Sequence, residues 1–152
     1  MIPKIIHYCW FGKNPLPEDA KRCIDSWRKY CPDYKIIEWN ESNYDVTSNE
    51  YMKAAYMEKK WAFVSDYVRI DVVYKYGGIY MDTDVELVKS LDELLNDRMY
   101  CGWEMRDPLL DKMGVSYENS VAFGLGFGAE KGHKALKKIL DLYKDISFYN
   151  ED

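Results

Sequence analysis

Residues 65–84 read SDYVRIDVVYKYGGIYMDTD, and no other part of the chain says as much about its fold. Apolar side chains recur at helical spacing over residues 65–76. Gly77 and Gly78 are expected to end this helix, because glycine adopts the left-handed conformation without a Cβ clash. The apolar run 79–81 is typical of a short buried strand. The stretch therefore predicts a helix, a glycine stop and a strand that leads directly into two carboxylates.

Those two carboxylates, Asp82 and Asp84, are separated by one residue. Side chains alternate along an extended chain, so both are expected to point to the same side. Two such carboxylates at a strand end suit a hard divalent cation such as Mn²⁺ or Mg²⁺. An isolated Asp-x-Asp pair is also common in solvated loops, but the helix and strand before this one favour a binding site.

Asp66 and Arg69 lie three residues apart on the predicted helix. On an exposed helix such an ion pair contributes only about 0.2–0.5 kcal/mol. The apolar neighbours Val68 and Val72 predict instead that this helix is largely buried. Because desolvating charged groups is costly, an ion pair on a buried helix requires an explanation. Asp71 points elsewhere on the helix and is interpreted as structural.

The rest of the chain alternates between predicted strands and helices. We expect strands at 4–10, 34–39, 79–81, 99–104 and 121–128, an extended segment at 85–88, and helices at 18–30, 51–57, 62–76, 91–95 and 131–143, with a loop at 106–118. This order predicts one α/β domain over residues 1–152, with a largely parallel central sheet flanked by helices. Ligands of such sheets bind beyond the carboxyl ends of the strands. Trp10, which ends the first strand, is therefore expected to share a crevice with Asp82 and Asp84.

Composition narrows the function classes. The chain has 152 residues, of which 47% are hydrophobic and 31% charged, which predicts a globular core. A net charge of −5 argues against a nucleic-acid-binding surface. The four cysteines lack paired spacing and are interpreted as free, mostly buried thiols, and zinc binding is not expected. With neither a signal peptide nor a membrane span apparent, we expect a cytoplasmic protein, peripheral at most at the inner face of a membrane.

These motifs closely resemble the sugar-binding region of glycosyltransferase family 32, an Asp-x-Asp group that includes initiating mannosyltransferases and bacterial capsular polysaccharide enzymes. The resemblance also covers residues 2–12 and 123–133, and thus nearly the whole chain. The matching positions in the central stretch are Ser65, Asp66, Arg69, Tyr74, Gly77, Gly78, Tyr80, Asp82 and Asp84.

The resemblance implies a GT-A type nucleotide-sugar-binding fold and a metal-dependent transfer of a hexose from a UDP- or GDP-hexose. The acceptor would be a hydroxyl of a carbohydrate, polysaccharide or lipid-linked glycan, and the anomeric configuration would be retained. The implied roles are as follows: nucleotide binding by His7, Trp10, Ser65, Tyr80 and Asp82; sugar binding by Asp66 and Arg69; Mn²⁺ or Mg²⁺ binding by Asp82 and Asp84; and catalysis by Asp82, Asp84 and Arg69.

Some alternatives stay open at this stage. Trp10 is equally consistent with a core tryptophan, and His7 in mid-strand with a backbone hydrogen bond. Gly126 and Gly128 suit either a close approach to a sugar or a β-bulge. Family members continue well beyond the length of this chain, so we expect it to be truncated at its C-terminal end. A nucleotide-sugar-binding module without turnover, or a phosphoryl-transfer metal enzyme, are the competing functions.

Overall fold

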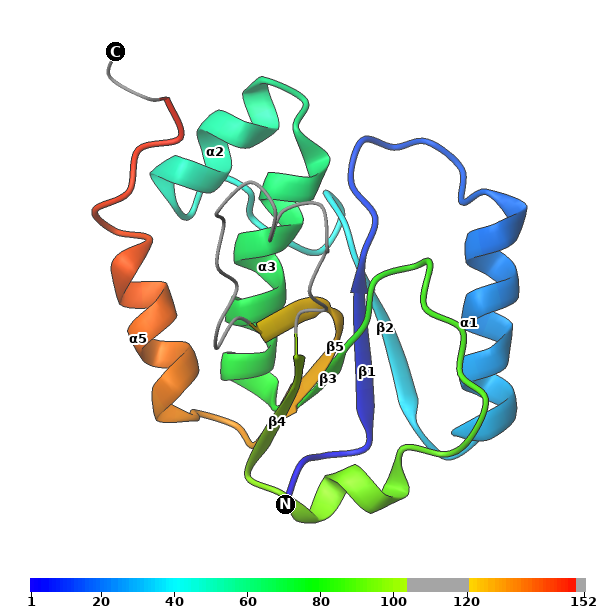
Figure 1. Ribbon diagram of the computed structural model, residues 1–152. Helices are drawn as coiled ribbons and strands as arrows, with labels where there is room; N and C mark the ends of the chain where they lie inside the picture. The colour runs from blue at the N-terminus through cyan, green and yellow to red at the C-terminus, as the bar shows by residue number, and fades with distance from the viewer. Residues whose placement is uncertain (104–120, 150–152) are drawn as a thin grey trace, which may run out of the picture.

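A computed structural model describes residues 1–103 and 121–149. These residues form a five-stranded sheet with the order β2-β1-β3-β5-β4, flanked by helices (Figure 1). The strands are β1 (Ile5–Cys9), β2 (Lys35–Trp39), β3 (Gly78–Tyr80), β4 (Met99–Trp103) and β5 (Val121–Ala129). The helices are α1 (Glu18–Tyr30), α2 (Glu50–Met57), α3 (Trp61–Tyr76) and α5 (Lys134–Leu142), with the 3₁₀ helix η1 (Asp92–Asn96) before β4.

The strand directions agree with the expected α/β class. β1 pairs in parallel with β2 and with β3. β5 is antiparallel to both β3 and β4, so β4 runs in the same direction as the first three strands. The largely parallel sheet predicted from the sequence is therefore confirmed, with β5 as the reversed strand.

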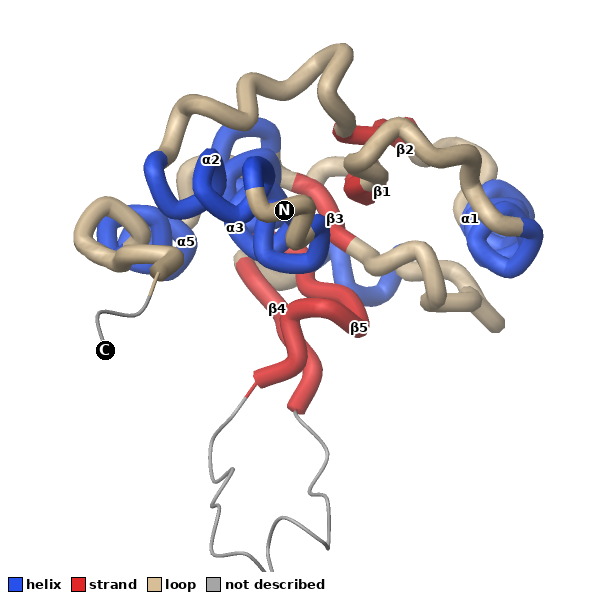
Figure 2. The backbone as a smooth tube through the Cα atoms, turned by 90° about the horizontal axis from the view of Figure 1, so that it is seen from above, coloured by secondary structure: helices blue, strands red, loops and turns tan. Residues whose placement is uncertain are grey.

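Two hydrophobic layers cover the sheet, with α1 on one face and α2, α3 and α5 on the other (Figures 1 and 2). Alternation along β1 explains the division. Ile6 and Tyr8 pack with Trp27 of α1, whereas Cys9 belongs to the cluster that contains Val68 of α3. Both clusters are built from buried apolar side chains, so each face of the sheet contributes to the core.

The glycine stop after α3 has the predicted geometry. Gly77 has φ +70° and its N–H donates to the carbonyl of Val73. Gly78 has φ +113°, and a Cβ there would lie 2.7 Å from the carbonyl oxygen of Ile5. Side chains other than hydrogen are excluded at this turn both by conformation and by space, which lets β3 lie directly beside β1.

Several boundaries differ from the sequence prediction. The helix at 18–30 has the predicted bounds, but the last helix begins only at Lys134. This later start has a local cause. Gly132 has φ +73°, and the His133 side chain caps the helix by accepting the N–H of Ala135. The expected extended segment at 85–88 forms no strand, because it leaves the sheet and packs against α1.

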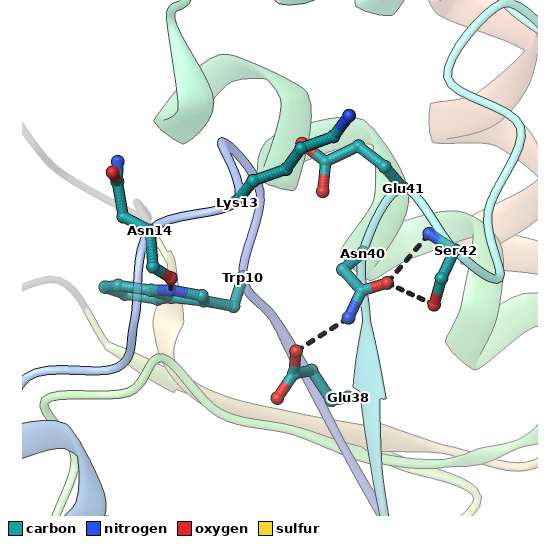
Figure 3. A pocket seen from close by; sticks show the side chains of 7 residues that line it. All are labelled: Trp10, Lys13, Asn14, Glu38, Asn40, Glu41 and Ser42. Atoms are coloured by element: carbon teal, nitrogen blue, oxygen red, sulfur yellow. Dashed lines mark hydrogen bonds between the residues drawn. The ribbon is translucent and has the colours of Figure 1, made fainter.

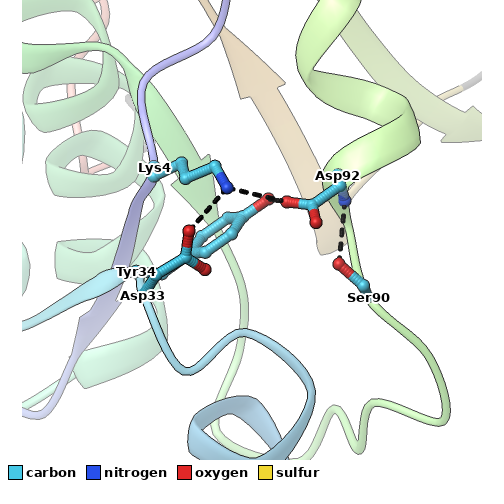
Figure 4. A network of polar contacts seen from close by, with 5 residues as sticks. All are labelled: Lys4, Asp33, Tyr34, Ser90 and Asp92. Atoms are coloured by element: carbon cyan, nitrogen blue, oxygen red, sulfur yellow. Dashed lines mark hydrogen bonds and ion pairs between the residues drawn. The ribbon is translucent and has the colours of Figure 1, made fainter.

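A polar cluster closes the end of the sheet opposite the carboxyl ends of β1 and β2 (Figure 4). The Lys4 ammonium lies 2.6 Å from a carboxylate oxygen of Asp33 and 3.3 Å from one of Asp92. The Tyr34 hydroxyl donates to the same Asp92 carboxylate at 2.9 Å. These contacts tie η1 to the starts of β1 and β2.

The cysteines of the described residues are free, as expected: Cys9, Cys23 and Cys31 are buried and Cys101 is exposed. Across residues 1–103 and 121–149, no helix has the length and apolarity needed to cross a membrane.

Candidate active site

A cavity of about 400 Å³ lies at the carboxyl ends of β1 and β3. Three segments that are distant in the sequence supply its wall: the loop after β1, the first turns of α3, and the residues after β3. The ends of the first and third strands therefore share one crevice, as predicted from the sequence. The lining residues are Cys9, Trp10, Phe11, Asn14, Trp61, Ala62, Ser65, Arg69, Tyr80, Asp82, Thr83 and Asp84.

The Asp82 carboxylate is held from several sides. Its Oδ1 accepts a hydrogen bond of 2.9 Å from the Tyr80 hydroxyl and lies 3.4 Å from an Arg69 guanidinium nitrogen. Its backbone N–H donates to the carbonyl of Gly124 on β5 at 3.2 Å. With Oδ1 engaged in this way, Oδ2 is the oxygen left to bind a ligand.

The backbone between the two acids corrects one sequence inference. The N–H of Val85 donates to the carbonyl of Asp82 at 3.1 Å, so residues 82–85 form a turn and not the extended chain on which the same-side argument rested. Both acids nevertheless line the cavity, Asp82 partly buried and Asp84 exposed. The turn is fixed to α1, because the Trp27 indole N–H donates to the Val85 carbonyl at 2.7 Å.

Arg69 is the central cation of the site and is only 8% exposed. One guanidinium nitrogen lies 3.1 Å from an Asp66 carboxylate oxygen, and Nε donates to the Ser65 carbonyl at 3.2 Å. The guanidinium also stacks over the Tyr80 ring, 4.8 Å from its centroid. The predicted Asp66–Arg69 pair is present, although Asp66 lies beside the cavity and not among the residues that line it.

The negative charge of the carboxylates in the site is only partly compensated by Arg69. Burial raises the pKa of Asp82, and the nearby Arg69 guanidinium offsets part of this effect. Burial likewise raises the pKa of Asp66, again opposed by Arg69. One guanidinium thus serves two carboxylates, with Asp84 close by. A further cation at this position would stabilise the ionised forms.

The donor set fits a hard divalent cation. Asp82 Oδ2 and the exposed Asp84 carboxylate are oxygen ligands of the type that Mn²⁺ and Mg²⁺ prefer. Within the described ranges, no three His, Cys, Asp or Glu side chains converge closely enough to enclose a metal. The remaining ligands would come from a bound diphosphate and water, as is common for Mg²⁺.

His7 is a correction to the predicted nucleotide-binding set. Its side chain is fully buried and lies outside the cavity wall. Nε2 lies 2.8 Å from the Gly77 carbonyl oxygen, and Nδ1 accepts the indole N–H of Trp39 at 3.1 Å. Both ring nitrogens are satisfied by the protein, so the neutral ring is a core residue that joins β1 to β2 and to the glycine stop.

The burial of His7 predicts a pH dependence of stability. Burial lowers the pKa of His7 from its ordinary 6.5 to about 4. The folded state resists protonation, so this contribution is fully present above pH 6.5 and is lost as the pH falls toward 4; it amounts to about 3 kcal/mol. Urea unfolding at pH 7, 5.5 and 4.5 is expected to show a shallower pH dependence for His7→Gln than for the wild type. Parallel curves for the wild type and His7→Gln would contradict the prediction.

Trp10 is placed as a cavity residue and not as a core residue. Its ring is partly exposed, and its indole N–H donates to the backbone carbonyl of Asn14 at 2.7 Å. This bond fixes the ring plane at the mouth of the cavity. Ser65 and Tyr80, the other expected nucleotide-binding residues, also line the cavity.

Sequence reasoning missed two residues that shape the site. A Cβ on Gly124 would lie 2.5 Å from Asp82 Oδ2 and 3.3 Å from an Arg69 nitrogen. β5 leaves its register with β4 around this residue, because Cys101 faces Phe127 but Gly102 faces Ala122. Gly126 lies within this irregular segment, as the β-bulge alternative predicted, whereas Gly128 pairs in register with Tyr100 and Ile79. Trp61 was the second omission: nothing in the residues around it signals that its ring lines the cavity.

The sequence matches the profile of a family described as "Glycosyltransferase sugar-binding region containing DXD motif" over residues 17–100. Among known proteins, it is similar to inositol phosphoceramide mannosyltransferase 3 of Schizosaccharomyces pombe, with 35% identity over 147 residues, which cover 91% of this chain and 36% of that protein. It is also similar to the mannosyl phosphorylinositol ceramide synthase SUR1 of Saccharomyces cerevisiae, with 33% identity over 103 residues, covering 62% of this chain and 26% of that protein.

A solved structure shares the architecture. The PaToxG glycosyltransferase superposes with a TM-score of 0.71 at 20% identity, covering 93% of this chain and 60% of that one. This likeness supports the GT-A type fold. The chain spans about a third of the length of the curated relatives it matches.

Proposed function

This chain belongs to the glycosyltransferases whose sugar-binding region contains the DXD motif, and we propose that it transfers a hexose from a nucleoside diphosphate sugar to a hydroxyl acceptor. The observation that supports this most strongly is the joint placement of Arg69, Asp82 and Asp84 in one cavity. A diphosphate needs positive charge and a sugar needs hydrogen-bonding partners, and this cavity offers both. The acceptor would be a glycan or a lipid-linked carbohydrate, consistent with the ceramide-linked names of the relatives.

In this proposal, Asp82 Oδ2 and Asp84 would hold Mn²⁺ or Mg²⁺ together with the diphosphate. When bound, the metal would supply Lewis acidity to the leaving diphosphate. Arg69 adds fixed positive charge beside the same group, already oriented by Ser65 and Tyr80. We propose that the Asp66 carboxylate, which pairs with Arg69 beside the cavity, would accept hydrogen bonds from sugar hydroxyls.

The proposed chemistry retains the anomeric configuration. The acceptor hydroxyl would attack from the side on which the diphosphate leaves, and a diphosphate oxygen would take its proton. No side chain is then required as a general base. In the cell, we propose that the protein works in the cytoplasm, at or near the inner face of a membrane.

The proposed function is tested by incubating the protein with UDP-glucose, UDP-galactose and GDP-mannose, with Mn²⁺ or with EDTA. The expected result is Mn²⁺-dependent release of nucleoside diphosphate from one of these donors, faster when a carbohydrate acceptor is present. Metal-dependent nucleotide binding without release would favour the binding module. Release of inorganic phosphate or cleavage of a nucleic acid, with no sugar released, would favour the phosphoryl-transfer alternative.

Trp10 is expected to stack on the nucleobase of the donor. Trp10→Ala should weaken nucleotide binding by on the order of 10-fold or more, because stacking on an aromatic ring contributes about 1–3 kcal/mol. The measurement is calorimetric nucleotide titration of both proteins, and nucleotide should also quench the intrinsic fluorescence of the wild type. Trp103→Phe, at an exposed tryptophan on β4, is the matched control. Unchanged affinity in a folded Trp10→Ala variant would show that the base binds elsewhere.

A further inference from the structure

Figure 3 shows the residues that line a second cavity, of about 310 Å³. It adjoins the first cavity, because Trp10 and Asn14 line both. A ligand that extends along the Trp10 ring from the acid pair would therefore enter this second space. Its other wall comes from the end of β2 and the loop that follows it. The function proposed above assigns the first cavity to sugar and diphosphate but leaves the chemistry of the second unexplained.

The second cavity has an acidic wall. Glu38, the last but one residue of β2, has its two oxygens held by the Tyr8 hydroxyl at 2.6 Å and the Asn40 amide at 2.7 Å. The Glu41 Oε1 accepts the backbone N–H of Gly12 at 2.6 Å and the Tyr56 hydroxyl at 3.2 Å. Each carboxylate is thus fixed by the protein.

The two glutamate carboxylates can accept further hydrogen bonds. An ionised carboxylate offers about four lone-pair sites. Glu41 Oε2 makes no hydrogen bond to any residue in the described part of the chain, and each Glu38 oxygen receives a single one. The cavity therefore presents fixed hydrogen-bond acceptors beside an aromatic plane. Neighbouring N–H donors on a flat ring would match this wall.

We propose that this cavity binds the nucleobase of the donor and that Glu38 and Glu41 select guanine over uracil; the inference rests on the function proposed above. The Watson–Crick edge of guanine presents two adjacent donors, N1–H and the 2-amino group, which match fixed carboxylate acceptors. Uracil presents one N–H between two carbonyl oxygens, and those oxygens would face the carboxylates. Lys13 also lines the cavity and supplies a donor suited to guanine O6.

Selectivity of this kind has a predictable size. Hydrogen bonds to charged groups are among the stronger ones in proteins, and an unmatched partner leaves an acceptor facing an acceptor. We expect GDP to bind on the order of 10- to 100-fold more tightly than UDP. ADP and CDP, which offer one exocyclic amine and no adjacent ring N–H, should resemble UDP.

The test is calorimetric titration of the whole chain with GDP, UDP, ADP and CDP in the presence of Mn²⁺, for the wild type and for Glu41→Gln and Glu38→Gln. Glutamine keeps the size and one acceptor oxygen of each side chain but replaces the other oxygen by a donor. GDP affinity should fall at least about 10-fold in Glu41→Gln, while UDP affinity stays equal or rises. Glu93→Gln, at an exposed position on η1, is the control and should match the wild type.

The outcomes separate this inference from the proposed function. Tight UDP binding, or equal affinity for GDP and UDP, would overturn the guanine assignment and leave the proposed function standing. A GDP preference that survives in both folded variants would overturn the role of the two glutamates. Failure of all four nucleotides to bind would overturn the proposed function and this inference with it.

Discussion

Replacing Arg69 with methionine is expected to lower donor turnover by on the order of 10²- to 10³-fold, the loss typical of removing a fixed electrostatic group from an active site. Methionine retains much of the side-chain length but not the positive charge. Asp66 and Asp82 would then both lack their counter-ion, at 3.1 and 3.4 Å in the wild type. Because Arg69 is buried, stability should fall as well, by roughly 3 kcal/mol.

Two measurements check this prediction. Nucleotide release from the donor reports turnover, and urea unfolding reports stability, so a folded but inactive protein can be recognised. Arg69→Lys keeps the charge but loses the planar fork that contacts Ser65 and Asp66, and its activity should be intermediate. Turnover by Arg69→Met at the wild-type rate would exclude Arg69 from the active site.

Gly124→Ala is expected to lower donor turnover by a similar factor, but for a steric reason. The new Cβ would lie 2.5 Å from Asp82 Oδ2, a distance at which one of the two groups has to move. Asp82 is restrained by Tyr80 and Arg69, so its displacement breaks the arrangement that orients the acid pair. A misplacement of about 1 Å can cost about 100-fold in rate.

The control for this substitution lies on the neighbouring strand. A Cβ on Gly102 meets no described atom within 4 Å, so Gly102→Ala tests the effect of alanine in the same sheet without a collision. We expect Gly102→Ala to keep wild-type turnover and Gly124→Ala to lose it, with both proteins folded by circular dichroism. Equal turnover in the two variants would mean that β5 does not set the position of Asp82.

The sequence predicted the local features that have short-range causes. The bounds of α1 follow from apolar spacing between Pro17 and Cys31, and the glycine stop at Gly77 follows from backbone conformation. The crevice shared by Trp10 and the acid pair follows from parallel strand direction, since carboxyl ends of parallel strands meet at one edge.

The features that escaped prediction depend on contacts between distant residues. The turn at 82–85 is held to α1 by the Trp27 indole N–H, which donates to the Val85 carbonyl, and no local pattern reveals this contact. The burial of His7 depends on Trp39, 32 residues away. Gly124 matters only because β5 pairs with β3 and passes the Asp82 carboxylate, a consequence of long-range register.

The proposed function requires that Asp82 and Asp84 hold a divalent metal together with a nucleoside diphosphate. The decisive measurement is thermal unfolding with GDP or UDP, each in the presence of Mn²⁺ or EDTA. The wild type is compared with Asp84→Asn, and Asp97→Asn, at an exposed acid after η1, is the control. We predict that at least one nucleotide raises the melting temperature by roughly 5–10 °C in the presence of Mn²⁺ but not with EDTA, and that Asp84→Asn loses this rise while Asp97→Asn keeps it. A rise that persists in full in Asp84→Asn, or that is the same with EDTA as with Mn²⁺, would contradict the claim.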